Sequence, residues 1–398
     1  MGLTAALALR ARGLSVVLLE ADPEQRARPG SRALFVHRQS LSTLEHVAPG
    51  LGKRIGDYGV VWQTRRTLYR GRQVYAKQMT RTDPTAPPPF SSLRQVDTER
   101  FLRAACVDAG VRFEWEAEVT AVHTTETAVS VSLNDGRNFH ASHLVAADGA
   151  RSTVRGALGI ALAGSRTEGS HVVVDVADGN GTNSNGTNSN GTNGPVERVF
   201  HYEHPGVGGR TVLRVPFRGG FQVDLQCRDN DPIEDFGTAE AVRAWLPGVI
   251  GDGHADQVLW VSTYHFLQKV AESFTDPHRR VLLAGEAAHL FPPFGARGMN
   301  SGIADADAAA EAIAGAVQDP GKATRFVDDY AATRRAAALF NSAAAGTALS
   351  HLRPRPLMRL RQRVAATLAP VLPRCGSWLE HAPYGPRHGP PTDPHRKY

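Results

Sequence analysis

Residues 292–302 combine proline and glycine in a pattern that lets backbone groups bind a ligand. They follow a short buried strand expected at 281–284 and lead into an alanine-rich helix expected at about 303–317. Gly295, Gly298 and Gly302 allow close approach of the main chain. Free N–H groups at a helix start, with the positive end of the helix dipole, favour an anion or an electron-rich ring edge. The segment therefore predicts a ligand-binding loop, with an ordinary glycine-rich turn as the alternative.

Acidic residues stand directly after three short apolar runs. Glu20 follows the run 14–19, Asp148 and Gly149 follow the run 143–147, and Glu286 comes soon after the run 281–284. Runs of this length, rich in valine and leucine, are typical of buried parallel strands. The three acids therefore mark the ends of three predicted strands.

The opening of the chain has the pattern of half a dinucleotide-binding βαβ unit. A helix is expected from Gly2 to about residue 11, then a glycine turn, a strand and Glu20, which stands 18 residues after Gly2. The usual fingerprint begins with a strand and G-x-G-x-x-G. Only Gly2 is present, at the place of the third glycine. The sequence predicts a unit that lacks about a dozen residues, judged against its usual length. An unrelated protein that begins with a helix is the alternative.

The remaining elements follow from periodicity and turn residues. An amphipathic helix is expected at 97–110, with helices at 323–349 and 357–368 near the end. Strands are expected at 111–115, 119–123, 129–133, 171–176, 198–202, 211–216 and 220–226. Asn134-Asp-Gly is a hairpin signal. Residues 179–194 repeat Asn, Gly, Thr and Ser, which cannot form a core, so they are expected to be a flexible insertion.

Composition excludes several classes of protein. Apolar residues make up 41% and charged residues 21% of 398 residues, which fits a large folded core. No apolar stretch is long enough for a membrane span, and no signal peptide is recognisable, so a cytoplasmic protein without membrane attachment is expected. Three distant cysteines fit a reducing compartment. The net charge of +6 comes from six arginines within 353–374, so we expect a solvated basic helix and no nucleic-acid partner.

Three stretches together resemble the class A flavoprotein monooxygenases of the para-hydroxybenzoate hydroxylase type. They are the opening unit 1–20, the stretch Leu-Val-Ala-Ala-Asp-Gly-Ala-Arg-Ser-Thr-Val-Arg at 144–155, and the strand and loop at 281–306. The stretch 293–302 looks most like the phenylpropionate-hydroxylase and polyketide-hydroxylase branches. The resemblance implies an α/β fold in which a Rossmann-like FAD-binding domain is interleaved with a mixed or antiparallel sheet that binds substrate, followed by a helical C-terminus.

The resemblance also implies domain limits and cofactor contacts. The FAD-binding domain would comprise 1–57, 90–160 and 270–345, and the substrate domain 58–89 and 161–269 with a low-complexity insertion at 178–195. Residues 346–398 would form a C-terminal helix and a disordered tail. The residues expected to contact FAD are Gly2, Glu20, Arg32, Arg38, Arg94, Gln95, Asp148, Gly149, Glu286, Pro293, Gly298, Met299 and Asn300. Asp148 and Gly149 also bear on NAD(P)H binding in that family. Arg151 and Arg155 would brace their motif.

Two departures from the family pattern concern the cofactor. Glu286 stands where the family has Asp, and the added methylene moves the carboxylate by about 1.5 Å, roughly one C–C bond. The contact it must make spans about 2.7–3.2 Å, so weaker FAD retention is expected unless the backbone adjusts. The phosphate-binding loop before Gly2 is the second departure. If translation starts upstream of Met1, the loop is restored; if it starts at Met1, we expect poor FAD binding and marginal folding.

The activity implied by the resemblance is FAD-dependent hydroxylation of a phenolic or polyketide-like aromatic substrate. NAD(P)H reduces the flavin, O2 adds at C4a, and the resulting hydroperoxyflavin transfers OH to the ring; the cofactor carries the chemistry. No side-chain catalyst is evident, although His201, Tyr202 and Arg210 on the predicted sheet are candidates. His289 could hydrogen-bond locally. The acid pairs 305/307 and 328/329 are expected to be solvated, and no metal-ligand spacing occurs.

Alternatives remain open at this point. One is a tailoring oxygenase that carries out epoxidation, Baeyer–Villiger insertion or antibiotic inactivation. Another is a truncated, non-catalytic remnant that holds no FAD. A flavin halogenase is disfavoured because no Trp-x-Trp-x-Ile-Pro stretch occurs. The small aromatic substrate, the choice of NADH or NADPH, and a monomeric or homodimeric state are not determined by the sequence.

Overall fold

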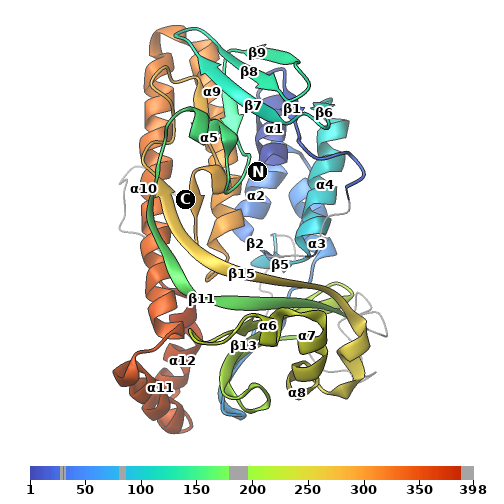
Figure 1. Ribbon diagram of the computed structural model, residues 1–398, viewed down its shortest axis with the longest axis vertical. Coiled ribbons are helices and arrows are strands. Elements are labelled where there is room, and N and C mark those ends of the chain that lie inside the picture. Colours follow the sequence, from blue (N-terminus) through green and yellow to red (C-terminus); the bar gives the residue numbers. More distant parts are fainter. Residues whose placement is uncertain (27–29, 31–32, 80–86, 179–195, 387–398) are drawn as a thin grey trace.

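The computed structural model describes residues 1–26, 30, 33–79, 87–178 and 196–386. A helix-rich part lies beside a part built on an eight-stranded sheet, and two long strands run from one part to the other (Figure 1). This confirms the expected α/β fold class with a helical C-terminus. The expected insertion falls almost wholly at 179–195, and the expected tail ends at 387–398; both stretches lie outside the described residues.

The helix-rich part contains two separate pairs of parallel strands. β1 (Val17–Leu19) pairs with β6 (Arg112–Glu114), and β10 (Leu144–Ala146) pairs with β16 (Val281–Leu283). β10 and β16 are short and apolar, and β16 is fully buried, as its run of valine and leucine predicts. β1 and β6 are partly exposed, and β6 carries the charged residues Arg112 and Glu114. Two antiparallel groups complete this part: β2 (Phe35–His37) with β5 (Phe90–Ser92), and β7 (Val119–Thr124), β8 (Val129–Leu133) and β9 (Asn138–Ala141).

The first helix, α1 (Gly2–Ala11), begins between the two parallel pairs. A Cβ built at Gly2 would lie 3.9 Å from Leu18 Cδ1, in β1, and 3.9 Å from Ala147 Cβ, directly after β10. The start of the helix therefore lies where both strand pairs end. In open α/β sheets, ligands bind outside the carboxyl ends of the strands, so this geometry places the candidate site here.

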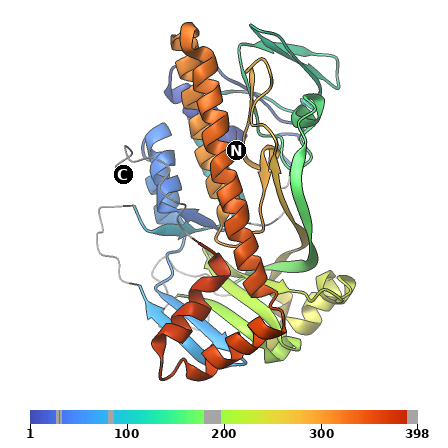
Figure 2. The ribbon, with the colours of Figure 1, turned by 90° about the vertical axis from the view of Figure 1, so that its left-hand side faces the viewer.

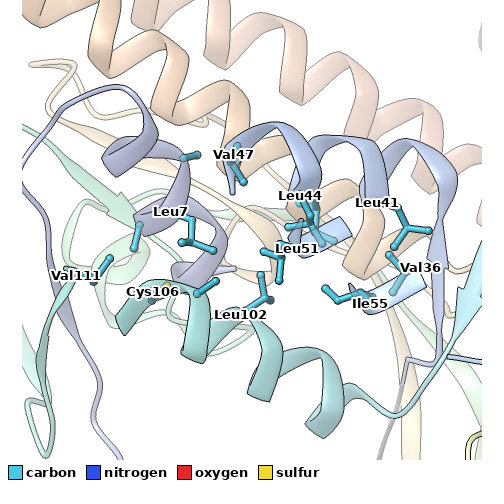
Figure 3. Close-up of a cluster of buried hydrophobic side chains, with 14 of the residues drawn as sticks. Leu7, Val36, Leu41, Leu44, Val47, Leu51, Ile55, Leu102, Cys106 and Val111 are labelled. Atoms are coloured by element: carbon cyan, nitrogen blue, oxygen red, sulfur yellow. The ribbon is translucent and has the colours of Figure 1, made fainter. Parts of the chain in front are cut away.

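The core of the helix-rich part lies among α1, α2 (Arg38–Val47), α3 (Leu51–Tyr58) and α4 (Gln95–Asp108) (Figure 3). The side chains that meet there are fully buried and come from all four helices: Leu7, Leu41, Leu44, Leu51, Ile55 and Cys106. Burying one leucine or isoleucine side chain stabilises a fold by about 1.5–3 kcal/mol. The positions of the strand ends beside α1 are held by this packing.

The eight-stranded sheet has the order β17-β15-β11-β14-β13-β12-β3-β4. All neighbours are antiparallel except β12 and β3, which are parallel. Its strands are β3 (Thr64–Tyr69), β4 (Arg72–Gln78), β11 (Leu162–Ala177), β12 (Glu197–His204), β13 (Arg210–Phe217), β14 (Gly220–Gln226), β15 (Val258–Ala271) and β17 (His289–Leu290). β11 and β15 are the long strands that connect the two parts. Residues 58–89 thus contribute two strands, β3 and β4, to this sheet.

Alternate residues of the central strands face opposite sides of the sheet. On one side, Val172, Val174 and Leu225 pack against α7 (Ala239–Trp245) and the neighbouring short helices α6 (Glu234–Gly237) and α8 (Pro247–Ile250). The intervening residues, His171, Val173 and Asp175 on β11, face the other side, toward the helix-rich part and the C-terminal helices. This second face is called the inner face below.

Long helices complete the fold. α9 (Arg297–Gln318) packs along α1, and α10 (Ala323–Leu352) packs along α9 over much of the molecule's length (Figure 2). α11 (Pro356–Leu368) and α12 (Pro373–His381) then cover one end of the sheet. Short 3-10 turns in the described residues lie at 205–207, 252–257, 285–287, 320–322 and 382–384. The arginines at 355, 359, 361, 363 and 374 are exposed. In the described part of the chain, no helix is both long and apolar enough to cross a membrane.

Element boundaries follow the sequence closely in the sheets and less closely at α9. β8 and β14 have the predicted bounds; β8 alternates in burial, whereas most residues of β14 are buried. The prediction that α9 begins at about 303 is wrong: it begins at Arg297, and two of the loop glycines lie within it. Glycine costs roughly 1 kcal/mol in a helix interior. The buried residues Ile303, Ala306 and Ala310 hold this end of the helix and offset that cost.

Candidate functional site

The first turn of α9 presents unpaired backbone donors to open space. Ala296, in the left-handed conformation, precedes the helix and provides no side-chain cap for its first turn. The amide of Ala296 bonds the carbonyl of Pro293 at 2.9 Å, which closes the turn. A Cβ built at Gly298 would meet no atom within 4 Å. The N–H groups at Gly298 and Met299 are therefore placed to bind an anion or the polar edge of a ring.

Asn300 fixes this turn against the helix-rich part. Its Oδ1 accepts hydrogen bonds from the His37 amide at 2.9 Å and from Ser40 Oγ at 2.7 Å, and its Nδ2 donates to the carbonyl of Phe35 at 2.8 Å. The side chain of Asn300 thus has a positioning role, while its backbone N–H lies in the first turn of α9. Arg38, one residue after His37, is exposed. Arg32 lies outside the described residues.

The Asp148–Gly149 motif is a local cap that also braces the next motif. The Asp148 carboxylate accepts hydrogen bonds from Ser152 Oγ at 2.5 Å and from the amide of Val154 at 3.0 Å, at the start of α5 (Thr153–Ala157). Gly149 has φ 82°, a conformation that favours glycine. Arg155 donates to the carbonyl of Ala287 at 3.0 Å and so connects this motif to the turn η3 (Gly285–Ala287). Asp148 remains exposed, with carboxylate lone pairs left for a ligand.

Glu286 and Glu20 both influence the amino group at the start of α1 through their charges. Burial lowers the pKa of the amino group of Met1, and the charges of Glu286 and Glu20 oppose that shift. Both carboxylates therefore act on the same point. The methionine side chain rests on two glycines: a Cβ at Gly285 would lie 2.6 Å from Met1 Cγ, and one at Gly302 2.3 Å from Met1 Sδ. The Glu286 side chain is exposed beside them.

Arg94 and Gln95 lie at the boundary between the two parts. Arg94 precedes α4, donates to Asp97 at 3.1 Å and places its guanidinium 5.7 Å from the ring centre of Phe217 on β13. Gln95 is exposed at the first position of α4. The pair is thus positioned near the sheet, as a contact to the middle of an extended cofactor requires.

These positions fit FAD as a group. Gly2 begins α1, Glu20 follows β1, Glu286 lies in η3, Asp148 and Gly149 follow β10, and the open turn of α9 offers N–H donors. Carboxylates suit ribose and ribityl hydroxyls because they accept hydrogen bonds. A helix N-terminus suits the electron-rich edge of a flavin ring. Within the described residues, no group of three or more potential ligands could hold a metal ion.

A buried ionic network lies behind the α9 turn. Asp305 accepts hydrogen bonds from His289 Nε2 at 2.6 Å, Arg334 Nε at 2.7 Å and the amide of Gly285 at 3.1 Å. Burial alone would raise the pKa of Asp305, but the bonds from His289 and Arg334 outweigh it, so the pKa is lowered. The network connects η3, β17, α9 and α10, and it supports the two glycines on which Met1 rests.

The expectation that both acid pairs are solvated is wrong for Asp305. Its side chain is 1% exposed, whereas Asp307 is 27% exposed and pairs with Arg12 at 2.8 Å. Asp328 pairs with Arg279 at 2.9 Å. No spacing in the sequence marks Asp305, because His289 and Arg334 approach it only through the packing of α9 on α10.

The three predicted catalytic candidates are held by protein partners. His201 Nε2 accepts a hydrogen bond from the amide of Gly71 at 2.9 Å. The hydroxyl of Tyr202 contacts His351 Nε2 at 2.8 Å and the carbonyl of Leu379 at 2.6 Å. Arg210 forms a two-bonded pair with Asp231 at 2.7 and 2.6 Å. These contacts hold all three side chains against other protein groups, and a different side chain lies next to the loop.

That side chain is His171, which the sequence analysis did not single out. It lies on the inner face of the sheet, and its ring is 5.8 Å from that of Phe294, the residue after Pro293 in the loop. Its Nδ1 is 2.6 Å from Asp224 Oδ1. The sequence signal for this pair was a polar residue within each of two predicted strands, His171 in 171–176 and Asp224 in 220–226. Their pairing depended on knowing that β11 and β14 are neighbours.

The strand pairs β1–β6 and β10–β16 end beside an exposed helix start, and a large sheet adjoins them. This arrangement defines a dinucleotide-binding flavoprotein fold. The family model described as "FAD binding domain" matches residues 1–342, and the chain belongs to this family. The resemblance to class A flavoprotein monooxygenases is thereby confirmed, and FAD is the cofactor of the family.

Sequence relatives agree with this assignment. The chain is 30% identical over 390 residues to 6-methylpretetramide 4-monooxygenase of Streptomyces rimosus, covering 93% of this chain and 63% of the relative. It is 26% identical to pentachlorophenol 4-monooxygenase of Sphingobium chlorophenolicum, covering 77% of this chain and 54% of the relative. The chain thus spans less than two thirds of the length of these relatives.

Solved structures show the same fold. p-Nitrophenol 4-monooxygenase from Pseudomonas putida superposes with a TM-score of 0.72 at 23% identity, covering 97% of this chain and 96% of the other. The flavin-dependent monooxygenase PieE, solved in complex with FAD and substrate, gives 0.74 at 20% identity, with 99% and 75% covered.

Proposed function

We propose that this protein is an FAD-dependent, NAD(P)H-consuming monooxygenase that hydroxylates a phenolic or polyketide-like aromatic compound. The relatives carry the names of hydroxylases and monooxygenases of aromatic compounds, which favours hydroxylation over the other oxygenations considered above. A cytoplasmic location, and a monomeric or homodimeric state, remain predictions.

One observation carries the proposal: the open α9 turn and the inner face of the sheet meet at Phe294. Phe294 contacts His171 with ring centres 5.8 Å apart and Phe266 of β15 with ring centres 5.2 Å apart. Aromatic walls favour an aromatic ligand through offset or edge-to-face contacts. A flavin ring seated at the α9 turn would therefore border a surface suited to a second ring.

The protein's own residues perform binding and orientation. Glu20, Asp148 and Glu286 would hold hydroxyl groups of the cofactor, and the N–H groups of Gly298 and Met299 would bind the edge of its ring. When bound, FAD supplies the redox chemistry, taking a hydride from NAD(P)H and activating O2. The aromatic wall excludes water from the reacting centre, which limits loss of reactive oxygen to solvent.

The first test is the visible absorption spectrum of the purified chain, with and without added FAD. The paired near-ultraviolet and blue bands of oxidised flavin, retained after gel filtration, are expected. Gly298→Val should abolish retention, because its side chain fills the open space before the α9 turn. Gly253→Val is the matched control, since a Cβ there also meets no atom within 4 Å. Equal retention in both variants would contradict the assignment of the turn.

The activity is tested by adding phenols to the flavin-loaded protein and following NAD(P)H oxidation and hydroxylated product together. Stimulated oxidation with product supports the proposal. Oxidation that yields only hydrogen peroxide with every phenol and polyketide tested would refute hydroxylation of these compounds. If flavin bands are absent with added FAD both in this chain and in a version extended by the codons upstream of Met1, the remnant hypothesis is favoured instead.

A further inference from the structure

The inner face of the sheet carries two buried polar atoms that have no protein partner. His171 is 3% exposed and Gln226 is 8% exposed. Neither His171 Nε2 nor Gln226 Oε1 has a hydrogen-bond partner among the described residues. Leaving such a group unsatisfied costs about 1–3 kcal/mol. Two of them at one place indicate a site built for a ligand.

The two residues are direct neighbours across the sheet. In the antiparallel register, His171 of β11 lies opposite Gln226 of β14, and opposite Tyr264 of β15 on its other side. Directly opposed residues project from the same face with Cβ atoms about 4.5–5.5 Å apart. Gln226 Nε2 donates to the carbonyl of Leu352 at 3.3 Å, which leaves Oε1 as an acceptor.

The hydrogen bond at Nδ1 sets the chemistry of His171. Asp224 Oδ1 lies 2.6 Å from His171 Nδ1, so the nitrogen that faces the carboxylate carries the proton. In the neutral ring, Nε2 then has a free lone pair and can accept a proton. This is the arrangement of a general base held by a carboxylate.

We propose that His171 Nε2 is the base that takes the proton of a phenolic hydroxyl of the substrate, that Gln226 Oε1 binds a second hydroxyl, and that Asp224 positions His171. The inference rests on the proposed function. It also narrows the substrate class, because two neighbouring acceptors select an aromatic compound that offers two hydroxyl donors.

The proton transfer is balanced without a further reactant. The phenolic O–H bond breaks, its electron pair stays on oxygen, and the proton forms a bond to Nε2. Asp224 stabilises the imidazolium through the Nδ1–H bond. The phenolate donates more electron density to its ring than the phenol does, so ring carbons ortho and para to the oxygen become better nucleophiles. The proton returns to solvent when the product leaves.

Two titratable groups among the described residues contact the His171 ring. They are Asp224 on β14 and Tyr264 on β15, whose ring is stacked 5.9 Å away. Phe266 and Phe294, at 4.3 and 5.8 Å, contribute uncharged rings from β15 and from the loop. Cys227, next in sequence to Gln226, packs into the core on the opposite face.

The test compares His171→Asn with Asp224→Asn, and with His140→Asn on the exposed strand β9 as the matched control. Asparagine can still donate to Asp224 but lacks a base at the Nε2 position. In His171→Asn, flavin absorbance and thermal stability should match the parent, whereas kcat for catechol, which offers two hydroxyl donors, should fall by about 10²–10⁴-fold. The loss should shrink as the pH approaches the phenol pKa of about 10, and also with 4-nitrocatechol, which has two hydroxyls and ionises more readily. His140→Asn should behave as the parent.

A loss below threefold, or a loss of equal size at every pH and for both phenols, would overturn the role of the base. If the parent hydroxylates no phenol at all, the proposed function fails separately. In that case the protonation of His171 Nε2 is measured from the ¹⁵N NMR signals of its ring, which are identified by their absence in His171→Asn. An unprotonated Nε2 at pH 8 retains the assignment, and a protonated Nε2 refutes it.

Discussion

Replacing Asp305 should destabilise the helix-rich part far more than replacing its neighbour Asp307. Asp305→Asn removes the charge that accepts hydrogen bonds from His289, Arg334 and the amide of Gly285. The Arg334 guanidinium, with its side chain 17% exposed, would then lack its charged partner. Breaking one side of a buried ion pair costs about 3–5 kcal/mol. The pair of Asp307 with Arg12 is partly exposed, so Asp307→Asn should cost about 0–1 kcal/mol.

Urea denaturation followed by circular dichroism measures both variants against the parent. The difference between the parent and Asp305→Asn should also depend on pH. Because the folded-state pKa of Asp305 is lowered, its stabilisation is complete above the unfolded pKa of about 3.9 and is lost as the pH falls through the lower folded value. Equal losses for the two variants, or a loss below 1 kcal/mol for Asp305→Asn, would refute the importance of the network.

Three further predictions concern other parts of the fold. Gly164→Ala should destabilise the fold by about 1–3 kcal/mol or more, because φ is 133° and the added Cβ would lie 2.1 Å from a β15 carbonyl oxygen. Gly156→Ala is the control, because a Cβ at Gly156 meets no atom within 4 Å and should not destabilise the fold. Thermal unfolding compares the two variants. Glu380→Gln leaves Arg198 buried without its charge partner at 2.7 Å, so α12 should be cut faster in limited proteolysis; unchanged rates would contradict this. Burial lowers the pKa of His351 from 6.5 to about 4, so stability should fall by up to about 3 kcal/mol between pH 6.5 and 4, and His351→Gln should flatten that slope in pH-dependent denaturation.

The buried networks differ in how they relate to function. Asp305 is satisfied by His289 Nε2 and Arg334 Nε, and this network supports the loop from behind. One ring nitrogen of each histidine, His289 Nδ1 and His171 Nε2, has no hydrogen-bond partner among the described residues. Partly satisfied polar groups are costly in a core. At His171 a second such atom, Gln226 Oε1, lies directly opposite on the neighbouring strand, and this pairing is the reason for assigning chemistry to His171.

Local patterns in the sequence determined the fold class, the order of the three motifs and most strand positions. Glu20, Asp148 and Glu286 each follow an apolar run, and the strand at 129–133 alternates in burial, so neighbouring residues alone define them. The start of α9 and the burial of Asp305 were decided by contacts with residues far along the chain. The pairing of His171 with Asp224 required the strand order of the sheet, because no spacing between positions 171 and 224 states that β11 and β14 are neighbours. The periodicity of hydrophobic residues is a property of a single helix or strand, whereas the polar partners of a side chain depend on how different elements pack together.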